Sequence, residues 1–206
     1  GVVVLRGNPD FESEDLLAWE LGFRTRLRPD LTLDLALFDN VYDNLRSQEL
    51  PPPGTAGPVV LGNELEGETR GVELAVNAQT APWWRWHASY TYLDKELRLD
   101  RGSRDPTGGR SEGNDPSHLA SLRSSLDLGA AWELDVLLRY VDELPFPPAP
   151  AVTEMDLRLG WRAMPGLELS LIGQNLLHDS HVQFRSGGAR IEEVERSVYG
   201  RVTWRF

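Results

Sequence analysis

The chain has 206 residues, of which 40% are hydrophobic and 26% charged, with a formal net charge of −11 and no cysteine. This length can bury a sizeable core in one domain, and the composition is too apolar for a disordered chain. The missing cysteine excludes disulfides and thiolate metal sites, and the acidic balance argues against nucleic acid as a partner, because phosphate binding needs a basic surface.

No apolar run approaches the roughly 18 residues of a transmembrane helix. A membrane is still possible, because a barrel strand needs only ~9–11 residues and alternates between apolar and polar side chains. The chain begins at Gly1, directly in an apolar run, and carries no signal peptide. We therefore expect a fragment or a processed piece of a longer protein.

Alternating segments follow one another along the chain, and helical patterns are almost absent. In one of these segments Trp132, Leu134 and Val136 fall on one face. Glu133 and Asp135 fall on the other face, as expected where successive side chains of a strand point in opposite directions. About ten strands are predicted in this way. Their ranges are 1–6, 15–27, 31–45, 59–79, 84–97, 117–128, 132–143, 152–163, 167–177 and 197–206.

The connections between these strands alternate between short and long. The short turns are Arg28–Asp30, the turn around Pro82, Gly129–Ala131 and Met164–Gly166. The long loops are 46–58, 98–116, 144–151 and 178–195. The prolines of the third loop cannot pair in a sheet interior, because proline lacks the amide donor. Short turns on one side and long loops on the other are typical of an outer-membrane barrel.

Aromatic placement distinguishes a barrel from a soluble sandwich, since both predict one apolar and one charged face. Five tryptophans share the apolar faces and mostly lie near strand ends beside the short turns: Trp19, Trp84, Trp86, Trp132 and Trp204. A soluble core would place them in mid-strand, whereas a barrel places them at the membrane interface. We therefore predict an all-β, antiparallel, up-and-down transmembrane β-barrel.

Several segments, in the same order, resemble TonB-dependent outer-membrane receptors. They are Gly7–Glu14, Trp19–Arg24, Gly71–Leu74, Ala88–Asp94, Asp115–His118, Gly173–Asp179 and the terminal Arg205–Phe206. The resemblance implies a 22-stranded barrel closed by an amino-terminal plug. Residues 1–206 would be the C-terminal segment of that barrel, with the plug domain, the TonB box and the first strands absent.

The resemblance also implies a function. Such receptors lie in the bacterial outer membrane and import scarce ligands such as iron–siderophores, cobalamin, nickel chelates or glycans. The expected partners are outer-membrane lipid and lipopolysaccharide, the missing plug and strands of the same chain, the TonB complex through the missing region, and a small chelate. Two alternatives stay open: a small standalone barrel acting as a pore or an outer-membrane enzyme, and a soluble carbohydrate-binding β-sandwich.

The residues that could take part in catalysis or binding form no recognisable catalytic set, phosphate-binding loop or cofactor site. His178 and His181, with Asp179 between them, could form a metal relay at the mouth of a barrel. The alternative, which we adopt, is that they are polar loop residues, because the family motif already accounts for Asn175–Asp179. His87 lies on a predicted strand and forms no ligand cluster; the same holds for His118. No catalytic, cofactor or metal residue is assigned.

The loop 98–116 carries acidic residues that could hold calcium, namely Asp100, Asp105, Glu112 and Asp115. Their spacing is not that of an EF-hand, and arginines are interleaved, so we predict a solvated loop of mixed charge. The arginines Arg101, Arg104 and Arg110 could instead attract an anionic chelate or lipopolysaccharide phosphate.

One further set of charged residues is predicted to line the lumen, to pair across strands and to contact the missing plug. It comprises Glu20, Arg24, Asp34, Glu73, Arg85, Arg123, Glu133, Asp135, Arg139, Asp156, Arg158, Arg201 and Arg205.

Overall fold

The computed structural model describes residues 4–110, 113–183 and 193–206, which form strands, turns and loops. The main sheet has ten strands. Its long strands are β2 (Asp15–Arg28), β3 (Leu31–Glu49), β4 (Val59–Ala81), β5 (Trp84–Leu99), β6 (His118–Leu128), β7 (Trp132–Val141), β10 (Val152–Met164), β11 (Leu167–Gln174) and β14 (Ser197–Trp204). Within the described ranges no helix is long and apolar enough to cross a membrane.

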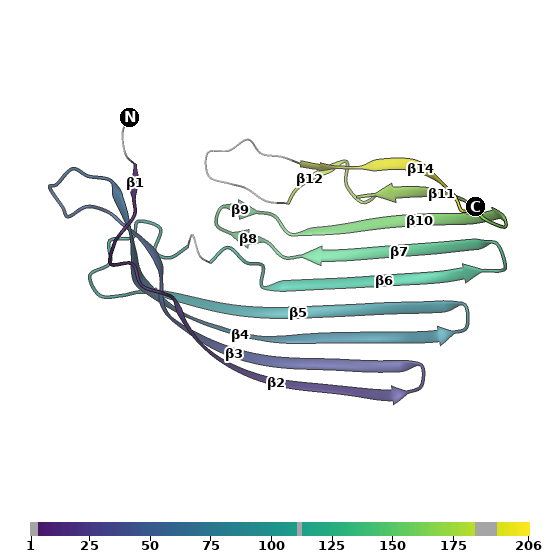
Figure 1. Ribbon diagram of the computed structural model, residues 1–206, viewed down its shortest axis with the longest axis horizontal. Helices are drawn as coiled ribbons and strands as arrows, with labels where there is room; N and C mark the ends of the chain where they lie inside the picture. Colours follow the sequence, from purple (N-terminus) through teal and green to yellow (C-terminus); the bar gives the residue numbers. More distant parts are fainter. Residues whose placement is uncertain (1–3, 111–112, 184–192) are drawn as a thin grey trace. The chain divides into compact units, whose positions relative to one another are not determined.

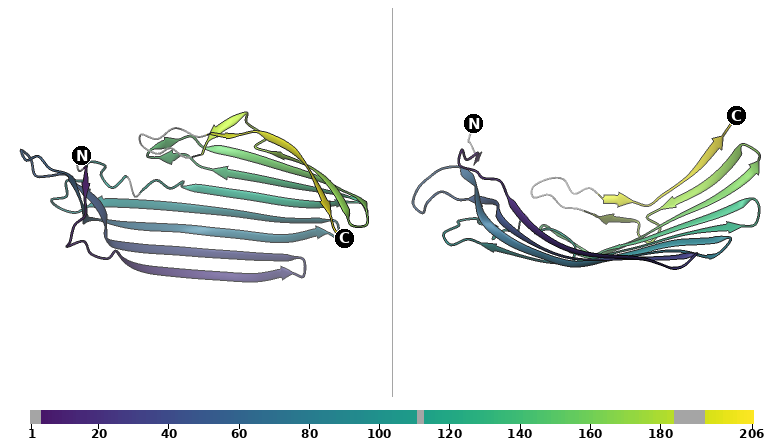
Figure 2. Two further views of the ribbon diagram at one scale, coloured as in Figure 1. Left: turned by 45° about the horizontal axis from the view of Figure 1, so that its top comes forward. Right: turned by 60° about the horizontal axis from the view of Figure 1, so that its bottom comes forward.

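The long strands are hydrogen-bonded in chain order, from β2 at one edge to β14 at the other (Figure 1). Neighbours run antiparallel, so that Trp132 lies opposite Leu128 on β6 and opposite Trp161 on β10. Figure 2 shows β7, β10 and β11 side by side from two other directions. The predicted up-and-down antiparallel architecture is confirmed. In the described sheet β2 and β14 are the two end strands, each hydrogen-bonded to a neighbour on one side only.

The four predicted short turns are confirmed as the tight connections between neighbouring strands. They are Pro29–Asp30, Pro82–Trp83, Gly129–Ala131 and Pro165–Gly166. Gly129 and Gly166 adopt φ angles of 74° and 80°. Glycine occupies this left-handed region without steric cost, which is why it stands at these two turns.

The turn at Gly166 also touches the end of the chain. The Arg205 amide donates a hydrogen bond to the Gly166 carbonyl at 2.8 Å, and a Cβ on Gly166 would lie 2.5 Å from the Arg205 carbonyl oxygen. We expect Gly166→Ala to lower the free energy of unfolding by about 1–3 kcal/mol, because backbone strain adds to the clash. Gly129→Ala is the matched control, since a Cβ there meets no atom within 4 Å. Equal losses in urea titrations of the two variants would contradict the clash.

The predicted first strand is different in the structure. Only Leu5–Arg6 forms a strand, β1, and it pairs in parallel with Val59–Val60 of β4 instead of lying beside β2. Two residues cannot span a bilayer, since a barrel strand needs ~9–11. Residues 1–3 of the predicted run lie outside the described residues.

Other differences concern the loops. β3, β4 and β5 extend past their predicted ends. The loop that follows β5 adds backbone hydrogen bonds of its own, such as Leu50 N to Arg104 O at 3.3 Å. The loop 144–151, whose prolines were predicted not to pair in a sheet interior, stays out of the main sheet. It forms a hairpin of β8 (Leu144–Pro145) and β9 (Pro148–Ala149). The last loop contains a hairpin of β12 (Ser180–Val182) and β13 (Glu193–Glu195), and its residues 184–192 lie outside the described part.

The chain divides into two compact units, each built on stretches of these strands. Unit 1 consists of Gly1–Leu21, Leu37–Gly71 and Leu93–Asp115, and unit 2 of Gly22–Ala36, Val72–Tyr92 and Pro116–Phe206. Few described side chains are buried: the hydrophobic ones are Leu65 in unit 1 and Ala149, Val152 and Ile172 in unit 2. Large apolar side chains are instead exposed, Trp204 by 74%, so this sheet does not use its apolar residues to build an interior core.

Candidate functional site

The register of unit 2 separates polar from apolar side chains into two faces. Residues directly opposite in an antiparallel pair share a face, and the next row points to the other face. One row is Trp84, Leu126, Leu134, Leu159 and Leu171. The adjacent row is Arg85, Ser125, Asp135, Arg158 and Ile172. We call the two sides the apolar face and the polar face; the polar face is the candidate functional surface.

Charged residues predicted to line the lumen pair across strands, as expected. Arg24 bonds Asp34, and the Arg85 Nη1 and Nη2 atoms lie 3.0 and 3.4 Å from the Asp127 carboxylate. Some members of the predicted set have no ion pair among the described residues. They are Glu20, Glu73, Arg123, Arg201 and Arg205.

The densest cluster surrounds Arg158 on β10. Its Nη1 atom lies 2.8 Å from Asp135 and 3.3 Å from Glu133 on β7, and its Nη2 atom bonds Glu168 on β11. Arg162 adds a second cation, 3.2 Å from Glu133. Two arginines and three carboxylates therefore tie together three strands on the polar face.

A second cluster centres on Glu154, whose side chain is buried on the polar face of β10. One carboxylate oxygen lies 2.9 Å from Arg139 Nη2 on β7. The other lies 2.9 Å from His181 Nε2 on β12, although the two atoms lack hydrogen-bond geometry. We treat the His181 contact as electrostatic. Glu154 thus connects the main sheet to the β12–β13 hairpin.

Asn175 fixes the same hairpin from the end of β11. It is 2% exposed and adopts a φ of 52°, in the left-handed region that asparagine tolerates better than most residues. Its backbone nitrogen donates to Asp156 Oδ1 at 3.0 Å, and its side-chain Nδ2 atom donates to the Val194 carbonyl at 2.9 Å. The predicted motif Asn175–Asp179 is therefore a joint between β10, β11 and β13.

The histidines of that loop take part in the same joint. His178 Nε2 lies 2.8 Å from the Thr153 carbonyl, and Asp179 pairs with Arg196 at 3.1 Å. The rings of His178 and His181 are 6.0 Å apart. Across the described ranges no group of three His, Cys, Asp or Glu residues could hold a metal ion. The absence of a metal site stays a prediction.

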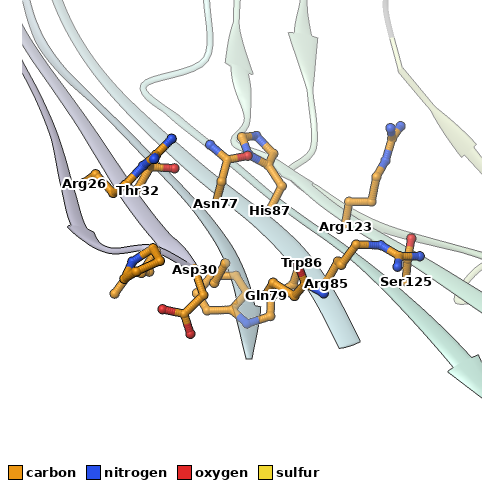
Figure 3. Close-up of a pocket in the computed structure, with 13 residues that line it drawn as sticks. Arg26, Asp30, Thr32, Asn77, Gln79, Arg85, Trp86, His87, Arg123 and Ser125 are labelled. Carbon is orange, nitrogen blue, oxygen red and sulfur yellow. The ribbon is translucent and has the colours of Figure 1, made fainter. Parts of the chain in front are cut away.

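A cavity of about 420 Å³ opens on the polar face of unit 2, beside the turns Pro29–Asp30 and Pro82–Trp83. Figure 3 shows Arg26 and Arg123 on opposite sides of it, with Asn77 and His87 between them. His87 Nδ1 and Asn77 Oδ1 are hydrogen-bonded at 2.9 Å. Strands β2 to β6 supply the lining, so five successive strands build this cavity.

In unit 1 the loop after β5 is anchored by Asp105, which is 7% exposed. Its carboxylate accepts hydrogen bonds from Gln48 N at 2.9 Å and from Thr107 N and Oγ1, both at 2.7 Å. Burial acts to raise the pKa of Asp105, but the bonds from Thr107, Gln48 and Gly108 outweigh it and lower the pKa below its usual value. Protein donors already surround this carboxylate, which argues against the calcium alternative here.

Three other predicted residues of that loop have local partners. Asp115 bonds Lys95, Arg104 Nε donates to the Leu50 carbonyl at 2.7 Å, and Arg110 Nε donates to the Thr107 carbonyl at 2.8 Å. Glu112 lies outside the described residues. These arginines stabilise the loop, and binding of lipopolysaccharide phosphate by them stays a prediction.

We expect the Asp105 anchor to be pH-dependent. Because folding lowers its pKa, its stabilisation is complete above the unfolded value of about 4 and is lost as the pH falls through the lower, folded value. Asp105→Asn should therefore speed proteolysis of the loop at pH 7, and this effect should shrink as the pH falls through the lowered pKa of the folded state. Asp100→Asn is the control. Identical cleavage rates in both variants at pH 7 would count against the anchor.

Sequence reasoning missed the contact between Glu154 and His181. Glu154 alternates with Asp156 and Arg158 as a polar-face residue, which the pattern does show. Its histidine partner comes from a loop hairpin that no alternation predicts. Asp127, Glu168 and Arg162 also belong to the polar face, as their alternation with leucines or with Trp161 indicates.

Aromatic residues mark two levels on the apolar face. Trp132 and Trp161 stack at 5.6 Å beside the tight turns, and Tyr140 lies further along the same strand as Trp132. The nine residues from Trp132 to Tyr140 match the ~9–11 residues of a barrel strand that crosses a bilayer. Trp19 does not fit the prediction, because it lies well before the β2–β3 turn. An apolar face with aromatic levels, a charged face and tight turns define a class: the wall of an outer-membrane β-barrel.

Comparison with known proteins gives the family. The model for the TonB-dependent receptor-like β-barrel matches residues 1–176, and the chain belongs to this family. Its members are transporters, not enzymes, in the bacterial outer membrane. The predicted resemblance and location are confirmed. No curated protein matches the chain in a sequence search.

Solved structures show the same fold. The ferric-catecholate import receptor Fiu from K12 E. coli is 19% identical with a TM-score of 0.72, over 95% of this chain and 28% of that chain. The siderophore receptor PiuA from Acinetobacter baumannii is 21% identical with a TM-score of 0.72, over 92% and 28%. The copper transporter OprC is 14% identical with a TM-score of 0.70, over 96% and 33%. The chain thus spans less than a third of the receptors Fiu and PiuA.

Proposed function

We propose that this chain forms part of the wall of a receptor that imports a scarce metal chelate, such as an iron–siderophore or cobalamin. The observation that carries the proposal is the ion-paired polar face of a sheet that the family model matches. A charged face backed by an apolar, aromatic-bordered face is suited to a hydrated lumen in lipid. The similar solved structures include siderophore receptors and a copper transporter, which supports a metal-containing cargo without selecting one.

We further propose that residues 1–206 are the C-terminal segment of the barrel. The two edges of the described sheet support this, because unpaired backbone groups are costly in lipid and need further strands. The plug, the remaining strands and the contact with the TonB complex would then be supplied by other parts of the receptor. Lipid would contact the apolar face, and the chelate would pass along the polar face.

The test is uptake by cells whose only copy of the gene encodes the intact receptor. Labelled ferric catecholate, ferric hydroxamate, cobalamin and copper would be supplied separately, with and without a protonophore. Energy-dependent uptake of one cargo, lost on deletion of the gene, is the expected result. Energy-independent passage of all solutes below a size limit would instead identify a passive pore and refute the proposal.

A further inference from the structure

The cavity beside the tight turns carries more positive charge than its ion pairs neutralise. Of its charged residues, Arg85 pairs with Asp127 and Asp30 pairs with Arg28 at 3.4 Å. Arg26 and Arg123 also line it and have no ion pair in the part of the chain that the structure describes. Two guanidinium groups therefore face one cavity without a carboxylate partner.

Neutral hydrogen-bond donors lie between these two arginines (Figure 3). Asn77 Oδ1 and His87 Nδ1 are hydrogen-bonded at 2.9 Å, and the amide oxygen is the acceptor. The Asn77 side-chain nitrogen makes no hydrogen bond within the described ranges and retains both of its donors. The cavity thus offers cations at two sides and an amide donor between them, and within the described ranges neither Arg26 nor Arg123 is ion-paired with a carboxylate.

We propose that this cavity binds a ligand carrying at least two carboxylate groups. Arginine presents paired N–H donors in a planar fork that matches a carboxylate, so Arg26 and Arg123 would each bind one group. A volume of about 420 Å³ lies within the range of small-molecule sites. The carboxylates belong either to a soluble polycarboxylate or to acidic side chains elsewhere in the receptor. The inference rests on the proposed function only in treating the polar face as the lumen.

The experiment uses the intact receptor in detergent, with citrate as the probe. Calorimetry at low salt compares the unchanged receptor with the double variant Arg26→Gln/Arg123→Gln. The control is Arg201→Gln, which removes another polar-face arginine outside the cavity. Circular dichroism melting without citrate gives a second readout for all three proteins.

Two results support the site and identify the source of the carboxylates. If citrate binds, and the double variant weakens binding by about tenfold or more while its melting temperature is unchanged, the ligand is a soluble polycarboxylate. If citrate does not bind, and the double variant melts at a lower temperature than Arg201→Gln, the carboxylates belong to the receptor. Citrate binding that the double variant leaves unchanged would overturn the proposal. So would absent binding with a melting temperature equal to the control.

These readouts are independent of transport. If no cargo were imported but the double variant still lost citrate binding, the proposed function would fail and this site would stand. If import were intact and the double variant behaved like the control in both measurements, only the site would fail.

Discussion

Replacing Val136 by Arg should lower the free energy of unfolding by about 2–4 kcal/mol, the cost of an arginine at the lipid midplane of a barrel. Val136 lies on the apolar face, opposite Leu157 and Ser124, and midway between Trp132 and Tyr140. A guanidinium there would face the centre of the hydrocarbon layer. Urea titration of the intact receptor in lipid vesicles, followed by the heat-modifiable gel shift of folded barrels, measures the loss.

The matched control is Leu137→Arg on the next residue. Leu137 belongs to the polar face, opposite Arg123 and Asp156. An arginine there has water and lies between the acidic Asp156 and the cationic Arg123, whose effects oppose each other, so we expect a change below about 1 kcal/mol. Equal losses in the two variants would show that the faces are wrongly assigned to lipid and lumen.

Replacing Glu154 by Gln should loosen the β12–β13 hairpin. The change removes a buried charge that lies 2.9 Å from both Arg139 and His181, and removing one partner of a buried polar contact costs about 1–3 kcal/mol. A loss of ~2 kcal/mol corresponds to local opening about 30-fold more frequent. Hydrogen exchange of the intact receptor, read by mass spectrometry over Ser180–Val182 and Glu193–Glu195, would report it.

Glu195→Gln provides the comparison, because Glu195 is an exposed glutamate of the same hairpin. Its exchange rates should equal those of the unchanged receptor. If Glu154→Gln also leaves them unchanged, Asn175 and its bonds to Asp156 and Val194 suffice to fix the hairpin, and the Glu154 contact is incidental.

Much of the sheet could be predicted from local pattern. Alternation such as Trp132-Glu133-Leu134-Asp135 indicates a strand and assigns both faces at once, since side chains of a strand alternate strictly. Gly129 and Gly166 mark turns for an equally local reason, their access to positive φ. The pairing of the first strand could not be predicted in this way, because an apolar run at 1–6 does not show that Leu5 and Arg6 pair in parallel with β4.

The candidate sites depend on contacts that no local pattern contains. The cation pair of the cavity requires Arg26 and Arg123, on strands far apart in sequence, to line one space. The Glu154 cluster requires a loop histidine to reach β10.

The sequence by itself determined the strands, their two faces, the tight turns and the family, because each is written in short-range alternation, turn chemistry or ordered motifs. Only the tertiary structure decided which charges meet: Arg158 with three carboxylates, and Glu154 with His181. It also decided that Arg26 and Arg123 have no ion pair among the residues that the structure describes. The physical reason is that ion pairing depends on distances of a few ångströms across strands, which strand register and loop folding set together.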